Sequence, residues 1–146
     1  MTVFAGLNIR MRLIALYGRS NCGKSDTLNR LKDLLRQAGT SISRIPHPDS
    51  DKPETFLYKG LTVCVAPGGD VREIVEGNLR YFTGKQCDVA VTASRTKGGT
   101  VDALTEFAAN NDIGIDWVEK SHESWLSRAT QQLCNQETAQ RIFEKI

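Results

Sequence analysis

The sequence predicts an α/β fold with three layers, in which a mostly parallel central sheet is flanked by helices on both faces. Continuous apolar runs, which are typical of strands buried on both faces, occur at residues 12–17, 61–66 and 88–93. Segments with apolar residues at helical spacing alternate with them. The clearest is residues 24–38, which are followed by Gly39 as a helix-ending residue. Its apolar face consists of Leu28, Leu31, Leu34 and Leu35.

Two shorter strands are predicted between these segments. Residues 41–45 form one of them, and residues 55–58 form the other. Lys59 and Gly60 fit a tight turn that joins the second of these strands to residues 61–66. The sheet is therefore expected to contain one antiparallel pair.

A polar segment rich in proline and aspartate, PHPDSDKP, occupies residues 46–53. This composition is typical of a loop, and we expect the segment to be mobile and to take no part in chemistry. The alternative is that Asp49 and Asp51 contact a substrate that accepts a phosphoryl group.

The second half of the chain continues the alternation of helices and strands. A helix is expected to open at Asp70, with a further helix over residues 101–109 and a strand over residues 113–118. A long terminal helix is expected over residues 121–146, interrupted near Asn135. The residues that the first of these helices is expected to bury are Val71, Ile74, Val75, Leu79 and Phe82.

Length and charge limit the classes of function. The chain has 146 residues, which predicts a single domain over residues 1–146, with residues 1–11 as an extension and Met11 as a candidate start. The net charge of +2 predicts no broad basic surface for nucleic acid or for an anionic membrane. No apolar stretch approaches the roughly 20 residues that a membrane-spanning helix needs. We therefore expect neither a membrane nor a nucleic acid as partner.

The cysteines and histidines predict neither disulfides nor a zinc site. Cys22, Cys64, Cys87 and Cys134 are far apart in the sequence and form no CxxC pair. The chain has only two histidines, which argues against a zinc site. Because the first residues also lack the pattern of a signal peptide, we expect a cytoplasmic protein.

The strongest functional signal is GRSNCGKS at residues 18–25, which fits the P-loop (Walker A) pattern GxxxxGK[ST]. Its glycines let the backbone turn tightly, so that consecutive N–H groups face phosphate oxygens. We expect Lys24 to reach the β- and γ-phosphates and the Ser25 hydroxyl to bind Mg²⁺. The predicted nucleotide-binding residues are Gly18, Ser20, Asn21, Cys22, Gly23, Lys24, Ser25 and Asp26.

On this motif the chain resembles the P-loop NTPase superfamily. A chance match arises in about one chain in a few hundred of this length, but a match that follows a strand and opens a helix is more specific. The resemblance covers the order of strands and helices over nearly the whole chain, whereas the specific motif is only residues 18–25. It implies a nucleotide at the carboxyl ends of parallel strands. It implies no particular reaction, because kinases, GTPases and ATPases share this loop.

A second acidic residue is expected near the motif, because P-loop enzymes usually hold Mg²⁺ with an acid at the end of a neighbouring strand. Residues 61–66 end without one, and Asp70 follows four residues after Ala66. Asp70 is therefore the candidate second metal ligand, expected to position the metal or the attacking water. The alternative is a helix N-cap with Glu73 as its capping-box partner, and the two roles are compatible.

The loop after residues 88–93 is expected at the same edge of the sheet and carries Arg95 and Lys97. Arg95 is the candidate catalytic cation that neutralises phosphate charge; the alternative is a solvated loop charge. Two glycines follow Lys97, so the Asn/Thr-Lys-x-Asp motif with which GTPases read guanine is missing. Trp117 is expected in the core rather than at a base pocket.

The function predicted from the sequence is binding of a nucleoside triphosphate, with Mg²⁺ and ATP as the expected ligand. The chain is expected to act as a small ATPase, a hydrolase in which Lys24, Asp70 and Arg95 carry catalysis. The alternatives left open are a small-molecule or nucleotide kinase, a GTP-dependent switch and a non-catalytic nucleotide switch. A protein partner or a second copy of the chain is left open as the source of missing groups.

Overall fold

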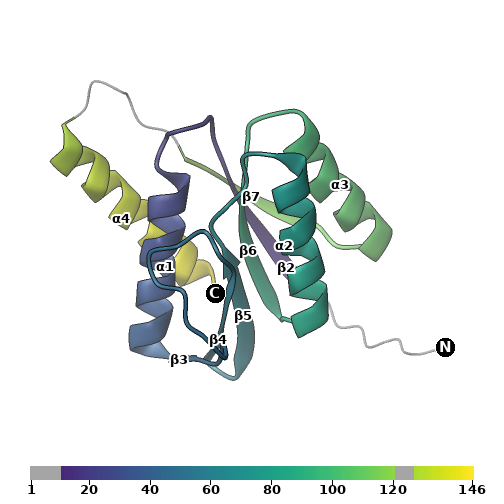
Figure 1. The fold of residues 1–146 in the computed structure, drawn as a ribbon, viewed down its shortest axis with the longest axis horizontal. Coiled ribbons are helices and arrows are strands. Elements are labelled where there is room, and N and C mark those ends of the chain that lie inside the picture. Colours follow the sequence, from purple (N-terminus) through teal and green to yellow (C-terminus); the bar gives the residue numbers. More distant parts are fainter. Residues whose placement is uncertain (1–10, 121–126) are drawn as a thin grey trace.

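The structure is a computed structural model that describes residues 11–120 and 127–146, and a mixed sheet lies at its centre (Figure 1). Within these residues, six strands have the order β3-β4-β5-β6-β2-β7. Strands β5, β6, β2 and β7 are parallel, while β4 and β3 extend the β5 edge in antiparallel pairing. The strand bounds are β2 Arg12–Tyr17, β3 Thr40–Ser41, β4 Glu54–Tyr58, β5 Leu61–Ala66, β6 Val89–Ser94 and β7 Ile115–Glu119.

Helices cover both faces of this sheet. Figure 1 shows α1 and α4 on one face and α2 and α3 on the other, and each pair is packed together. In the described part of the chain the four helices are α1 Lys24–Ala38, α2 Arg72–Lys85, α3 Gly99–Asn111 and α4 Arg128–Lys145. The predicted α/β fold, with a mostly parallel sheet between helices, is confirmed. None of the described helices is both long and apolar enough to cross a membrane.

Strand β2 lies inside the sheet, between β6 and β7, and its side chains alternate between two cores. Ile14 and Leu16 pack under α1 and α4, whereas Leu13 and Ala15 pack under α2 and α3. All four side chains are at most 2% exposed. This double burial explains the continuous apolar run in the sequence.

Several predicted boundaries are confirmed. Helix α1 has the predicted bounds, and the Gly39 N–H donates to the carbonyl oxygen of Leu35. Lys59 and Gly60 both have positive φ angles in the turn between β4 and β5. Strand β3 is shorter than the predicted residues 41–45. The pairing ends because the hydroxyl of Ser43, rather than a backbone carbonyl, accepts the N–H of Thr55.

The predictions for the start of α2 are wrong in two respects. The helix begins at Arg72 with Val71 as its N-cap and no capping side chain, so Asp70 is not the cap. Val71 and Ile74 are 47% and 46% exposed rather than buried. Val71 precedes the first helical residue, and Ile74 in the first turn lies next to Gly68 of the connection after β5. Helix α2 buries Val75, Leu79 and Phe82 as predicted.

The terminal helix α4 is continuous through Asn135, so the predicted interruption is wrong. Asn135 is buried against the loop that follows β2, since a Cβ atom added to Gly23 would lie 2.5 Å from the Asn135 Oδ1 atom. Its place is explained by packing rather than by a break in the helix. Residues 121–126 of the predicted helix lie outside the described residues.

Gly69 lies directly against β6, so replacing it should destabilise the fold. A Cβ atom there would collide with the backbone carbonyl of Ala93. We expect Gly69→Ala to lower the free energy of unfolding by about 1–3 kcal/mol in urea titrations, because main chain must move. The matched control is Gly77→Ala in α2, where the described side chains leave room for the new methyl group and the flexible Arg80 guanidinium lies 3.7 Å from it. This control should stabilise the protein by roughly 0.5–1 kcal/mol, and equal effects of the two variants would contradict the prediction.

Candidate functional site

The loop of residues 18–23 connects β2 to α1, as the motif requires. Strand β2 ends at Tyr17, and α1 begins at Lys24. Asn21 and Gly23 adopt left-handed φ angles of 62° and 95°. Gly23 is the N-cap of α1 and provides no side chain to cap it, so among the described residues the N–H groups of the first turn have no capping side chain. The loop therefore presents backbone donors at a positive helix end.

A cavity of about 340 Å³ opens beside this loop, at the carboxyl edge of the parallel strands. Six segments enclose it: the end of the loop, the first turn of α1, residue 51 of the loop before β4, the connection after β5, the first turn of α2, and the first two turns of α4. The lining residues are Asn21, Gly23, Lys24, Ser25, Asp26, Asp51, Pro67, Gly68, Gly69, Asp70, Ile74, Gln131 and Asn135. The cavity brings together six of the predicted site residues and adds others that were not predicted.

Lys24 turns its ammonium group back over the loop. The Nζ atom donates to the carbonyl oxygens of Gly18 at 2.7 Å and Arg19 at 2.8 Å. Asp70 Oδ1 lies 3.7 Å from the same nitrogen. Lys24 is only 6% exposed, whereas Asp70 is 59% exposed. The ammonium is thus held in the loop, and the carboxylate that faces it is exposed to solvent.

Ser25, the predicted Mg²⁺ ligand, donates its hydroxyl proton to Asp51 Oδ1 at 2.9 Å. The carbonyl oxygen of Pro67 lies farther away, at 3.5 Å. Asp51 belongs to the polar loop of residues 46–53, which was expected to take no part in chemistry. The structure places one carboxylate of that loop in contact with the motif.

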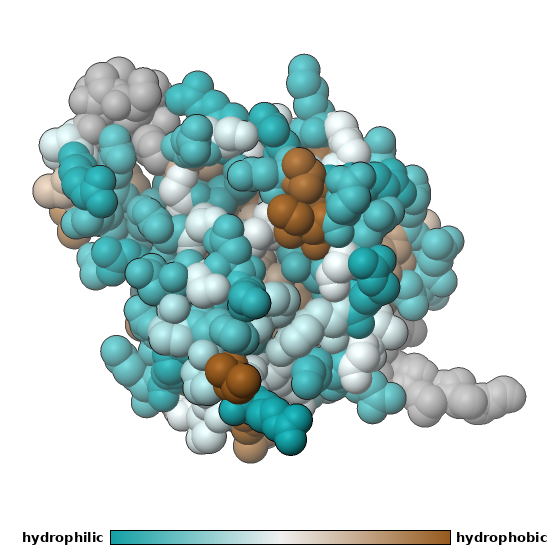
Figure 2. Space-filling model, viewed as in Figure 1, coloured by the Kyte–Doolittle hydropathy of each residue, from teal (hydrophilic) through white to brown (hydrophobic). Residues whose placement is uncertain are grey.

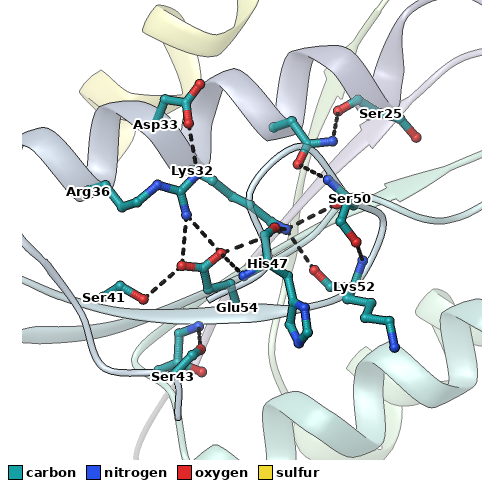
Figure 3. Close-up of polar contacts among 12 residues, drawn as sticks. Ser25, Lys32, Asp33, Arg36, Ser41, Ser43, His47, Ser50, Lys52 and Glu54 are labelled. Atoms are coloured by element: carbon teal, nitrogen blue, oxygen red, sulfur yellow. Dashed lines mark hydrogen bonds and ion pairs between the residues drawn. The ribbon is translucent and has the colours of Figure 1, made fainter. Parts of the chain in front are cut away.

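Buried Lys32 fastens this loop to α1 (Figure 3). Its Nζ atom donates to the carbonyl oxygens of His47 at 2.9 Å, Ser50 at 3.1 Å and Lys52 at 2.7 Å. Burial lowers the pKa of Lys32 to about 8, even though Glu54 favours the charged form. Three backbone carbonyls therefore accept the hydrogen bonds that water would accept from an exposed lysine ammonium group.

Glu54 closes the same cluster from β4. It is fully buried and accepts two hydrogen bonds of 2.8 Å from Arg36 and one of 2.7 Å from Ser41. Burial acts to raise its pKa, but these donors and the backbone N–H of His47 hold it below the ordinary value. Glu54 thus stays ionised, 4.0 Å from Lys32 Nζ.

Asn29 links the cluster to the motif. Its Nδ2 atom donates to the carbonyl oxygen of Ser25 at 3.1 Å, and its Oδ1 atom accepts the N–H of Ser50 at 3.0 Å. Ser25, Asn29, Lys32 and Arg36 follow one another at helical spacing and form a polar stripe along α1. This spacing of polar residues on an otherwise leucine-rich helix is the sequence signal that could have identified the cluster.

Asn135 of α4 completes the wall of the cavity near Gly23. The side chain is 4% exposed. Its Oδ1 atom is the one fully buried side-chain N or O atom, among the described residues, without a hydrogen-bond partner. A buried polar atom without a partner is costly, so a ligand donor would be stabilised at this point.

The structure does not bring every predicted residue to the cavity. Among the described residues, those that line it do not include Arg95 or Lys97, and both of these are exposed. Cys22 is buried and points its Sγ atom at the carbonyl oxygen of Lys120, 3.4 Å away, rather than toward the cavity. Gly18 and Ser20 belong to the loop but are not part of the cavity wall. Trp117, expected in the core, is 38% exposed and packs edge-on against the Tyr17 ring.

Hydrophobic side chains border the cavity on one side. Figure 2 shows apolar surface over the beginning of α2, where Val71 and Ile74 are exposed. Ile74 also lines the cavity. The site therefore combines the apolar side chains of Ile74 and Pro67 with a wall that is otherwise mostly polar.

Comparison with protein-family models, with curated proteins and with solved structures found no match to this chain.

The lowered pKa of Lys32 predicts a pH dependence of stability. Between pH 8 and the ordinary pKa of 10.5, the unfolded chain binds this proton more tightly than the folded protein. The free energy of unfolding should therefore rise with pH across this interval through the Lys32 contribution. We expect urea titrations to show a wild-type advantage over Lys32→Met that grows from pH 7 to pH 10. The other titrating groups cancel in the comparison, so parallel pH profiles would contradict the prediction.

Proposed function

We propose that this chain binds the triphosphate of a nucleotide together with Mg²⁺, with ATP as the expected ligand, and hydrolyses it slowly as a small ATPase. The observation that carries the proposal is the geometry of residues 18–25. Left-handed backbone at Asn21 and Gly23, the ammonium of Lys24 drawn into the loop and the open first turn of α1 all border one cavity. Backbone donors at a helix N-terminus next to a lysine are a chemistry that suits phosphate.

The residues present also suit a magnesium ion. Mg²⁺ prefers oxygen ligands and is usually held by one or two carboxylates together with substrate phosphates. Ser25 supplies a hydroxyl oxygen, and Asp26, Asp51 and Asp70 supply carboxylate oxygens around the cavity. When bound, the ion would neutralise charge on the phosphates. In this proposal Lys24 leaves Asp70 to contact the phosphates, and Asp70 becomes free to orient a water molecule.

A specific observation also favours a second candidate, a non-catalytic nucleotide switch. Hydrolysis benefits from a cation on the developing phosphate charge, yet Arg95 is not among the described residues that line the cavity. Such a protein would bind nucleotide and turn it over only when a partner supplied the missing cation. Release of phosphate from Mg-ATP by the purified chain distinguishes the two candidates.

Lys24→Ala should abolish nucleotide binding, since it removes the only lysine at the cavity wall among the described residues. We expect ATP with Mg²⁺, at about 100 times its dissociation constant, to stabilise the wild-type protein by about 2.7 kcal/mol. The variant should show no such shift in thermal unfolding. GTP, CTP and UTP, each with and without Mg²⁺, test the base preference.

The matched control for this experiment is Lys85→Ala, which removes an exposed lysine from the last turn of α2. The first turn of that helix, not the last, borders the cavity. This variant should keep the full shift. Undiminished stabilisation of a folded Lys24→Ala protein by ATP would contradict the proposed function.

Asp70→Asn should slow any hydrolysis of Mg-ATP. If the carboxylate of Asp70 orients the attacking water, its loss should lower the rate of phosphate release about 100-fold or more, because a positioned acid–base group contributes about 10²–10⁴-fold. The rate is measured by continuous phosphate detection under saturating Mg-ATP. An unchanged rate in the variant would remove Asp70 from the mechanism, and no release by the wild type would favour the non-catalytic switch.

A further inference from the structure

The charges around the cavity raise a problem for phosphate binding. The described residues that line the cavity include one lysine and three aspartates, Asp26, Asp51 and Asp70, so a triphosphate alone would meet more negative than positive side-chain charge there. A divalent cation resolves this repulsion. Yet no three His, Cys, Asp or Glu side chains within residues 11–120 and 127–146 are grouped closely enough to hold a metal ion. The cation therefore needs phosphate oxygens as ligands and should enter with the nucleotide.

The hydroxyl of Ser25 is oriented for a cation. A serine hydroxyl has one proton to donate and two lone pairs that accept or coordinate. Here the proton is directed to Asp51 Oδ1, 2.9 Å away, which leaves both lone pairs of the Ser25 oxygen for a ligand. A carboxylate in this position also adds negative charge next to the cation.

The backbone on both sides of Asp51 is fixed. Lys32 Nζ donates to the carbonyl oxygen of the preceding residue, Ser50, and to that of the following residue, Lys52. Asn29 accepts the N–H of Ser50. The Lys32 and Asn29 side chains come from α1, the same helix whose first turn carries Ser25. Serine and carboxylate are therefore held by one rigid element.

We propose that Asp51 is the carboxylate that completes the Mg²⁺ site of the bound nucleotide, taking the place of the acid that is missing from the end of β5. Lys32 is the positioning residue that holds it there. This inference rests on the proposed function, because the cation arrives with the nucleotide.

Asp70 is the competing candidate, and its contacts differ. Its carboxylate faces a cation, Lys24 Nζ at 3.7 Å, whereas Asp51 faces the Ser25 hydroxyl. Asp70, which is paired with the Lys24 ammonium, is suited to separate from it when phosphate binds. Asp51, which accepts the Ser25 proton, is suited to stay in place and hold the hydroxyl oxygen toward the cation.

The test measures how much Mg²⁺ strengthens nucleotide binding. Calorimetric dissociation constants for the β,γ-imido analogues of ATP and GTP are determined with Mg²⁺ and with EDTA, and their ratio is compared between variants. Asp51→Asn should reduce this ratio by about 10- to 100-fold, as loss of an outer-shell carboxylate typically does. Binding in EDTA should stay at or above the wild-type strength, because a negative charge has been removed.

The matched control is Asp49→Asn. Asp49 lies in the same loop, is exposed and has a positive φ of 52°, which asparagine tolerates well. Asp49→Asn removes the same charge as Asp51→Asn, at a position two residues away. The Mg²⁺ dependence of nucleotide binding in the Asp49→Asn variant should therefore stay at the wild-type value. A general electrostatic effect of the loop would move both variants together and would overturn the proposal.

The role of Lys32 is tested by a double-mutant cycle. Lys32→Met should reduce the Mg²⁺ dependence in the wild-type background and have no further effect in the Asp51→Asn background. A merely structural role would lower affinity in Mg²⁺ and in EDTA alike. Circular dichroism and thermal melts establish that each variant is folded.

The outcomes separate this inference from the proposed function. If neither analogue binds the wild-type protein in Mg²⁺, the proposed function fails and the inference fails with it. If binding is abolished by Lys24→Ala but Asp51→Asn keeps the wild-type Mg²⁺ dependence, the proposed function stands and the inference is overturned. Loss of Mg²⁺ dependence in Asp70→Asn, with Asp51→Asn unchanged, would assign the carboxylate to Asp70.

Discussion

The arrangement of the site depends on the burial of one ammonium group, that of Lys32. A charged group removed from water must find partners, and here they are three backbone carbonyls of one loop and the Glu54 carboxylate. Removing the loop would leave the cation without these acceptors, and removing the cation would leave a buried carboxylate with Arg36 as its remaining charged partner. Loop and helix therefore hold each other in place, and the position of Asp51 follows from that constraint.

The parts of the molecule that could be predicted from sequence are those determined by near neighbours. Strand β2, the motif and α1 appear where apolar runs, glycines and leucine spacing put them, because each depends on residues a few positions away. Lys32 could not be predicted in the same way. A lysine on the polar face of an amphipathic helix is ordinarily solvated, and its burial arises from a loop about 15 to 20 residues further along the chain.

The sequence around Asp70 has the pattern of a helix cap, but the structure does not form that cap. Aspartate followed three residues later by glutamate has the form of a capping box, yet the helix starts one residue beyond Val71 and uses no capping side chain. The carboxylate lies instead next to Lys24, an ion pair between residues 46 positions apart in sequence. Asp70 therefore pairs with a distant lysine rather than with a nearby backbone N–H group, and only the folded chain reveals that partner. The same applies to Asn135, whose packing against Gly23 has no local signature.

The strand order has a geometric consequence for the size of the site. Strand β6 lies between β2, which leads into the phosphate-binding motif, and β5, which leads to Asp70. Neighbouring strands are about 4.8 Å apart, so the two connections start roughly 10 Å from each other whatever side chains they carry. Gly69 presses the second connection onto the end of β6, and this brings it back toward the first. The distance between Lys24 and Asp70 is therefore set by strand spacing and loop length rather than by the choice of side chains.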